Sequence, residues 1–191
     1  MRLFVAVELD RGLRQALARA WEQRQTELCA GIRSVGEERL HLTLRFVGET
    51  ADERIADVVA AAEAAAARFE PFSFAVRGLG AFPRPRSAKV FWAGLEPCPV
   101  LEQLARTVDR ELRERRFPPE PRRFSPHVTL ARAKGPPVRL AAALEPDLPR
   151  FGEQEVDAVT VLESRLSPRG PVYVPVARLP LSEGAGPRVG P

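Results

Sequence analysis

The chain has 191 residues, of which 45% are apolar and 28% charged, with a net charge of +4 and a pI of about 9.8. This composition is typical of a soluble globular protein, and the length suits one compact domain or two small lobes. No apolar run reaches the roughly 20 residues that span a bilayer, and the N-terminus predicts a strand rather than a signal peptide. Two cysteines, Cys29 and Cys98, cannot form a disulfide framework. Together these features predict a cytoplasmic protein.

Residue patterns predict a strand over residues 2–8, a helix from Asp10 to about Leu28 and a strand over residues 39–46. Thr50 and Glu53 match a capping box for a helix that continues to about Arg68. The later predicted elements are strands over residues 72–77, 89–93, 126–131, 156–162 and 172–179, a helix over residues 99–115 and a short helix over residues 138–144. Several strands follow one another directly, which favours an α+β fold with antiparallel pairing.

Two chemical classes lack their sequence signatures. The chain contains no dinucleotide-binding glycine fingerprint and no P-loop, which argues against NAD and nucleoside triphosphates as cofactors. It also contains no GxSxG nucleophile elbow of a serine hydrolase.

The two histidines of the chain, His41 and His127, occur in the same short pattern. Their contexts are LHLTLRFVG and SPHVTLARAK, so each histidine is followed by an apolar residue, a threonine and a leucine. The copies lie nearly half the chain apart. This spacing indicates an internal duplication, in which two lobes each contribute one copy.

Strand geometry predicts what the repeated pattern presents, because alternate side chains share a face. The first copy is expected to place on one face His41, Thr43 and Arg45, and on the other Leu42, Leu44 and Phe46. In the second copy His127 and Thr129 share a face. Phe46 is therefore expected in the core. If both strands line one cleft, two imidazoles and two hydroxyls converge there.

Two imidazoles can perform phosphodiester chemistry without a metal. A neutral imidazole takes a proton from the attacking water, and a protonated one gives a proton to the leaving oxygen. An ordinary histidine pKa near 6.5 allows both forms at neutral pH. A zinc site would need three or four ligands, and neither copy has a Cys, Asp or Glu nearby on the same face. We therefore expect no metal and no cofactor.

The doubled pattern resembles the signature of the 2H phosphoesterase superfamily. Within it, the chain is similar to the bacterial and archaeal RNA 2′,3′-cyclic phosphodiesterases, also called 2′-5′ RNA ligases. The resemblance covers most of the chain and rests on the blocks RLFVAVEL, HLTLRFVGE, GLGAFPRPRSAKVFWAGL, FSPHVTLAR and ESRLSPRGPVYVPVARLPL. It implies a bilobal α+β (LigT-like) fold, in which two pseudo-twofold-related lobes have antiparallel sheets lining a central cleft and helices outside. Residues 1–181 would form this domain, and residues 182–191 a flexible tail.

The resemblance also implies roles for individual residues. His41 would be the general acid and His127 the general base, although the near symmetry of the motifs leaves the exchanged assignment open. Thr43 and Thr129 would hold the phosphate. Arg132 would complete the site, yet strict alternation points it away from His127, so a bulge or the strand end must turn it inward.

The implied reaction is hydrolysis of a terminal 2′,3′-cyclic phosphate of RNA to a 2′-phosphate, with 2′-5′ ligation as a side activity. The expected partner is an RNA with such an end, for example a tRNA fragment, and the expected state is a monomer. Two alternatives stay open: another 2H phosphodiesterase, acting on small cyclic nucleotides or 2′-5′ oligonucleotides, and a non-catalytic RNA-binding module.

Further residues are candidates for RNA contact around the site. Phe124, Phe46 and Tyr173 are candidates for stacking on a terminal base, although strand parity with Leu42 and Leu44 favours core packing for Phe46. Two arginine groups could contact the RNA backbone without reading sequence. One group precedes the second motif, and the other lies in the loop AFPRPRSAK: Arg113, Arg115, Arg116, Arg122 and Arg123, and Arg84 and Arg86. A solvated surface with Arg–Glu pairs is the other interpretation.

Overall fold

The computed structural model describes residues 1–25, 31–138, 150–168 and 170–182. The helices in these residues are α1 (Arg11–Gln25), α2 (Ile55–Ala66) and α3 (Pro99–Glu114). The strands are β1 (Arg2–Glu8), β2 (Ile32–Ser34), β3 (His41–Glu49), β4 (Phe72–Phe82), β5 (Val90–Leu95), β6 (His127–Ala133), β7 (Arg150–Val156), β8 (Ala158–Arg165) and β9 (Val172–Pro180). Predictions for residues 26–28, for the helix over 139–144 and for the tail from 183 lie outside the described residues.

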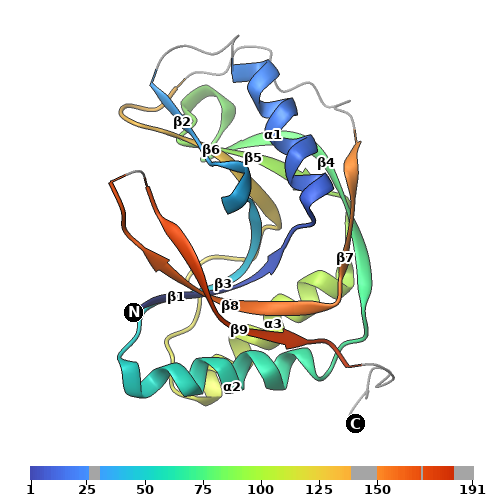
Figure 1. Cartoon of the computed structure of the whole chain (residues 1–191), viewed down its shortest axis with the longest axis vertical. Coiled ribbons are helices and arrows are strands. Elements are labelled where there is room, and N and C mark those ends of the chain that lie inside the picture. The colour runs from blue at the N-terminus through green and yellow to red at the C-terminus, as the bar shows by residue number, and fades with distance from the viewer. Residues whose placement is uncertain (26–30, 139–149, 169, 183–191) are drawn as a thin grey trace.

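All strands of the described chain join one antiparallel sheet in the order β7-β4-β5-β6-β3-β1-β8-β9, with β2 also paired to β6. The predicted α+β fold with antiparallel pairing is confirmed. The sheet has two halves, β3-β1-β8-β9 and β6-β5-β4-β7, which meet through the single pair Leu42–Val128 (Figure 1). Each half carries one copy of the histidine motif, and each is assembled from segments far apart in the sequence.

The helices pack against these two halves. Helix α1 contacts β6 and β7, whereas α3 contacts β3 and α2 contacts β8 and β9 (Figure 1). Apolar residues at helical spacing explain this packing, because α1 buries Leu13, Leu17 and Trp21 along one stripe. On the strands, Leu42 and Val128 are fully buried in the same core. The opposite face of β3 and β6, which carries the histidines, is thereby left for a site.

The capping box predicted for Thr50 and Glu53 is wrong. The Thr50 hydroxyl donates to the carbonyl of Gly48 at 3.2 Å, and its backbone N–H donates to the carbonyl of Met1 at 2.7 Å. Thr50 therefore belongs to the end of the β1–β3 ladder. A 3₁₀ turn over Asp52–Arg54 separates it from α2, which begins without a side-chain cap.

The strand predicted over residues 156–162 is two strands. Val156 ends β7, which pairs with β4, and Ala158 begins β8, which pairs with β1 and β9. A single residue, Asp157, takes the chain from one half of the sheet to the other (Figure 1). The apolar pattern continues across Asp157 and hides this change. Strand β7, whose sequence RFGEQEV is mostly polar, and the short β2 were not predicted for lack of a pattern.

Candidate active site

The two motif strands, β3 and β6, lie next to each other and run antiparallel. Their shared pair, Leu42 and Val128, points into the core, so the flanking histidines and threonines lie on the other face and are half-buried. The antiparallel register sets His41 on the side of Thr129, and Thr43 on the side of His127. The structure therefore brings the four predicted motif residues together, and it relates them by an approximate twofold rotation.

Each motif strand has a bulge at the leucine that follows the threonine. In β3, Ala6 of β1 pairs with Thr43 and Val5 pairs with Arg45, so Leu44 is passed over. In β6, Trp92 pairs with Thr129 and Phe91 pairs with Ala131, so Leu130 is passed over. A bulge reverses the face of the residues that follow it, up to the next bulge in the strand. The residues that follow therefore lie on faces that strict alternation does not predict.

Two predictions for the first motif are wrong for this reason. Arg45 is buried, with 5% exposure, on the face away from His41, and Phe46 is 56% exposed on the histidine face. The Phe46 ring lies 6.1 Å from the ring of Phe4, which in turn lies 5.0 Å from His41. In the second motif the bulge turns Arg132 outward on the face of His127, as its assignment requires. The role of Arg132 stays a prediction.

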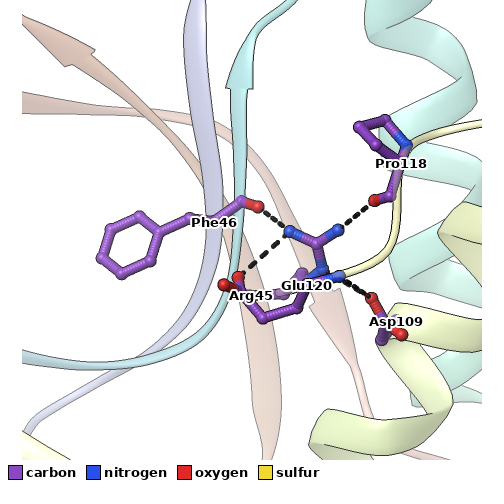
Figure 2. A network of polar contacts seen from close by, with 5 residues as sticks. All are labelled: Arg45, Phe46, Asp109, Pro118 and Glu120. Atoms are coloured by element: carbon purple, nitrogen blue, oxygen red, sulfur yellow. Dashed lines mark hydrogen bonds and ion pairs between the residues drawn. The ribbon is translucent and has the colours of Figure 1, made fainter. Parts of the chain in front are cut away.

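Arg45 holds the bulged part of β3 on the core side of the sheet, through the contacts drawn in Figure 2. Its Nε lies 2.7 Å from Oδ1 of Asp109 on α3, and its Nη1 lies 3.2 Å from Oε2 of Glu120. The guanidinium also donates to the backbone carbonyls of Phe46 and Pro118. The strand of His41 is thus fastened to α3 and to the segment that leads toward His127.

Both imidazoles are oriented by the same backbone device. His41 Nδ1 lies 2.7 Å from the carbonyl oxygen of Arg39, and His127 Nδ1 lies 2.7 Å from that of Ser125. A carbonyl oxygen only accepts, so Nδ1 carries a proton and donates in both residues. This leaves each Nε2 for chemistry, as acceptor when neutral and donor when protonated. His41 Nε2 lies 3.0 Å from Oγ1 of Thr43.

Aromatic rings pack around both histidines. Phe4 and Tyr173 contact His41, with ring centroids 5.0 Å and 4.9 Å away. Phe82 and Trp92 contact His127 at 5.1 Å and 6.3 Å. Of these rings the sequence pattern singled out only Tyr173. Strand parity is the signal that could have found Trp92 and Phe82. Trp92 pairs with Thr129 on one side and with Gly80 on the other, and Phe82 lies two residues after Gly80, so both rings share the face of the motif.

The indole of Trp92 lies directly over Gly80, its partner on β4. A Cβ atom on Gly80 would come within 2.1 Å of the indole ring. Residue 80 therefore has to be glycine for the Trp92 ring to keep its position over β4, 6.3 Å from the ring of His127. The Trp92 Nε1 atom is buried and has no hydrogen-bond partner in the described structure.

The surroundings lower the pKa of both histidines below the ordinary value of about 6.5. Burial is the largest cause for each, because a charged imidazolium loses hydration there. The positive charge of Arg132 acts in the same direction on both. Opposing influences are the carbonyls of Arg39 and Ser125, which stabilise the protonated rings, and for His41 the carboxylate of Glu8.

Tyr173 shares the environment of His41. Burial raises the pKa of its hydroxyl, although the charges of Arg132 and Arg39 partly oppose this rise. Tyr173 and Arg132 therefore lie at one site, although they come from different halves of the sheet. Phe124 packs instead against the main core and makes no ring contact with His41 or His127 in the described structure.

The described residues contain neither a cluster of metal ligands nor a membrane-spanning helix. No group of three or more His, Cys, Asp or Glu side chains is arranged to hold a metal ion there. Among the described helices, none has the length and apolarity needed to cross a membrane.

Comparison with known proteins gives a consistent result. The family model of the 2′-5′ RNA ligase superfamily matches residues 11–167. An RNA 2′,3′-cyclic phosphodiesterase of Methanothermobacter thermautotrophicus is 35% identical over 176 residues, which are 91% of this chain and 95% of the relative. A protein of the same name from Thermus thermophilus is 36% identical over 187 residues, which are 95% of this chain and 90% of the relative.

Solved structures share the whole fold. A crystal structure from Thermus thermophilus has a TM-score of 0.82 at 33% identity, with 97% of this chain and 99% of that chain covered. The crystal structure of E. coli LigT complexed with 3′-AMP has a TM-score of 0.77 at 26% identity, with 95% and 98% covered.

Proposed function

Since the chain belongs to the 2′-5′ RNA ligase superfamily, we propose that it is an RNA 2′,3′-cyclic phosphodiesterase that uses its two histidines as acid and base. The observation that carries this proposal is the matched pair of imidazoles. Both are held at Nδ1 by a backbone carbonyl, and both keep Nε2 for proton transfer on one face of adjacent strands. The relatives from Methanothermobacter thermautotrophicus and Thermus thermophilus are named for the same activity, which supports the proposal.

The reaction can be written with these groups alone. His127 Nε2 takes a proton from water as the water oxygen bonds to phosphorus. The P–O3′ bond breaks, and protonated His41 gives its Nε2 proton to the leaving 3′ oxygen. The product is a 2′-phosphate beside a free 3′-hydroxyl. Each turnover leaves the two protonation states exchanged, so proton transfer with solvent restores them.

The threonines and Arg132 bind the phosphoryl group in this proposal. The hydroxyls of Thr43 and Thr129 donate to the non-bridging oxygens, and the guanidinium of Arg132 offsets the charge that develops on them. The substrate phosphate also counteracts the lowered pKa values of the two histidines, which favour the neutral form of both rings in the free site. Its negative charge stabilises an imidazolium, so binding raises the depressed histidine pKa values toward the range in which one ring is protonated.

The aromatic rings near His41 receive the terminal nucleoside in this proposal. The leaving 3′ oxygen belongs to that nucleoside, so its base lies on the side of the general acid. Tyr173 and Phe4 line that side, and Phe46 offers an exposed ring beyond them. E. coli LigT, which shares the fold, was crystallised with 3′-AMP and so accommodates a nucleotide. Phe124, a predicted stacking residue, has no ring contact with this group.

The finer aspects of the activity are part of the same proposal. Residues 1–181 act as one bilobal catalytic domain and as a monomer in the cytoplasm, on RNA ends such as those of tRNA fragments. Joining of RNA ends through a 2′-5′ linkage is the reverse reaction, with a ribose 5′-hydroxyl in place of water. Water at about 55 M outcompetes that hydroxyl, so ligation is a side activity.

The decisive experiment uses EDTA-treated protein and a short RNA that ends in a 2′,3′-cyclic phosphate. We expect the wild type to form a 2′-phosphate, and His41→Ala and His127→Ala to form none. Circular dichroism of each variant should match the wild type, because neither imidazole belongs to the core. A product made equally by either variant would overturn the two-histidine mechanism. A folded wild type that binds the RNA end without hydrolysis would indicate a binding module.

A further inference from the structure

A group of basic residues from segments without acidic residues lies beside one end of β6. No Asp or Glu occurs between Glu70 and Glu96 or between Glu120 and Glu145. The first segment contains the β4–β5 loop and the second contains β6, so the fold joins the two acid-free segments. Five of their exposed basic residues lie in the β4–β5 loop or at the end of β6, and we call these five the basic rim: Arg84, Arg86, Lys89, Arg132 and Lys134.

Backbone hydrogen bonds hold the parts of the basic rim together. Ala88 and Val138 exchange two hydrogen bonds of 2.8 Å, which fasten the β4–β5 loop to the segment after β6. The N–H of Ala133 donates to the carbonyl of Lys89 at 2.9 Å, and Val90 pairs with Arg132. The rim is therefore one surface held by defined contacts.

The rim is continuous with the catalytic face. The β4–β5 loop begins directly after Phe82, whose ring centroid lies 5.1 Å from that of His127. Arg132 belongs to both, because its charge lowers the pKa of His41 and of His127. The phosphodiester backbone of an RNA strand that extends from the site on this side would pass Arg132 first and then the β4–β5 loop.

The rim side chains differ in charge pairing from several other exposed arginines. Those arginines pair with acids, for example Arg2 with Glu49 at 3.1 Å and Arg178 with Asp157 at 2.6 Å. Within the described part of the chain, no rim side chain forms an ion pair or hydrogen bond. The cations of the rim are thus uncompensated. Interfaces that neutralise phosphates have this character, whereas paired surface charges do not.

We propose that the basic rim binds the phosphodiester backbone of the RNA on the 5′ side of the terminal nucleotide. The inference rests on the proposed function and adds a preference to it: an oligonucleotide with a cyclic end is a better substrate than a cyclic mononucleotide. The contacts are to phosphates and carry no base sequence preference. The arginines before the second motif lie outside the rim. Arg115 is paired with the buried Glu111, and Arg122 and Arg123 precede the opposite end of β6.

The test compares two double variants of equal charge change. R84A/R86A removes two loop cations that touch neither histidine, and R2A/R178A removes two paired cations from the other half. Each protein is assayed on a 2′,3′-cyclic mononucleotide and on a single-stranded RNA of about ten nucleotides with the same end, at about 50 and about 200 mM salt. Thermal unfolding verifies that both variants fold.

We expect R84A/R86A to lower kcat/KM for the oligonucleotide about tenfold at the lower salt, with mononucleotide hydrolysis unchanged. Each lost phosphate contact removes about 0.7 from the slope of log kcat/KM against log salt, so the slope should fall by about 1.4. R2A/R178A should behave as wild type on both substrates. The proposal that the rim binds the RNA backbone would be overturned if R84A/R86A lost activity equally on both substrates or lost none. It would also be overturned if R2A/R178A had the same effect as R84A/R86A. A wild type inactive on both substrates would instead overturn the proposed function.

Discussion

Phe46 and Arg132 occupy equivalent positions on the two motif strands. Each lies three residues after the motif threonine and directly beyond a bulge, on the face of its own histidine. A nearly symmetric pair of motifs thereby presents an aromatic ring on one side of the site and a cation on the other. This asymmetry suits a reaction in which one histidine faces a nucleoside and the other faces water and phosphate oxygens.

Phe46→Ala should weaken substrate binding without weakening the fold. The ring is 56% exposed, so its loss should change the free energy of unfolding by no more than about 0.5 kcal/mol. Stacking of a base on an aromatic ring is worth about 1–3 kcal/mol, so KM should rise roughly tenfold. Phe91→Ala is the matched control: it removes a phenyl that is 1% exposed and should cost about 3–5 kcal/mol. A large stability loss for Phe46→Ala would place its ring in the core after all.

The pH dependence should follow from the depressed pKa values of His41 and His127. The proposed mechanism requires one protonated and one neutral ring, and kcat/KM reports the free enzyme. Because both pKa values lie below the ordinary 6.5, the free enzyme loses its imidazolium before the pH reaches that value, so kcat/KM should be highest on the acid side of it. The kcat profile should lie at higher pH, because bound phosphate stabilises the imidazolium. Initial rates across pH 5 to 9, at about tenfold below and above KM, separate the two profiles. Identical profiles with an alkaline limb near pH 9 would contradict the assignment.

Removing Arg45 should destabilise the protein strongly. Its guanidinium is buried between two carboxylates, and Arg45→Ala would leave Asp109 and Glu120 without that partner (Figure 2). Breaking a buried ion pair costs about 3–5 kcal/mol. Arg2→Ala breaks an exposed pair with Glu49, which is worth about 0–1 kcal/mol, and serves as control. Urea unfolding of both variants measures the difference, and equal midpoints would show that the Arg45 network adds nothing to stability.

Gly80→Ala should disturb the indole of Trp92. A methyl group at residue 80 would meet the ring within 2.1 Å, so the ring must move away from the sheet beside His127. Overpacking of this kind costs about 1–3 kcal/mol, and kcat should fall with it.

Gly12 in α1 provides the control, because a Cβ atom there meets nothing within 4 Å. Gly12→Ala should therefore stabilise the helix by about 0.5–1 kcal/mol. Tryptophan fluorescence and thermal unfolding compare the two, and an unshifted spectrum in Gly80→Ala would refute the contact.

Much of this site could be read from local sequence. The period-two pattern around His41 and His127 placed both histidines and both threonines on one face of their strands, because side-chain alternation depends only on the local backbone. Apolar residues at helical spacing in α1 and α3 likewise mark the helix faces that are buried, and this spacing is visible in the sequence. The family could also be recognised from local sequence, because its signature is a short motif that occurs twice.

Strand pairing could not be read in the same way. A bulge arises when a strand has one residue more than its partner, so Leu44 and Leu130 are passed over only because β1 and β5 lie beside them. The prediction for Phe46 failed at this point. Asp157 poses the same problem, since its role in joining two halves depends on partners distant in sequence.

Local sequence predicts the side chains of the candidate site: two histidines and two threonines in strands whose other face is apolar. What surrounds these side chains depends on the folded chain. Folding turns Phe46 and Arg132 to the face of the histidines, Arg45 toward Asp109, and brings two acid-free segments side by side. The difference lies in the distance along the sequence over which each feature is specified. Alternation along a strand is a local property, whereas bulges, buried ion pairs and charge clusters depend on contacts between residues that the chain brings together only on folding.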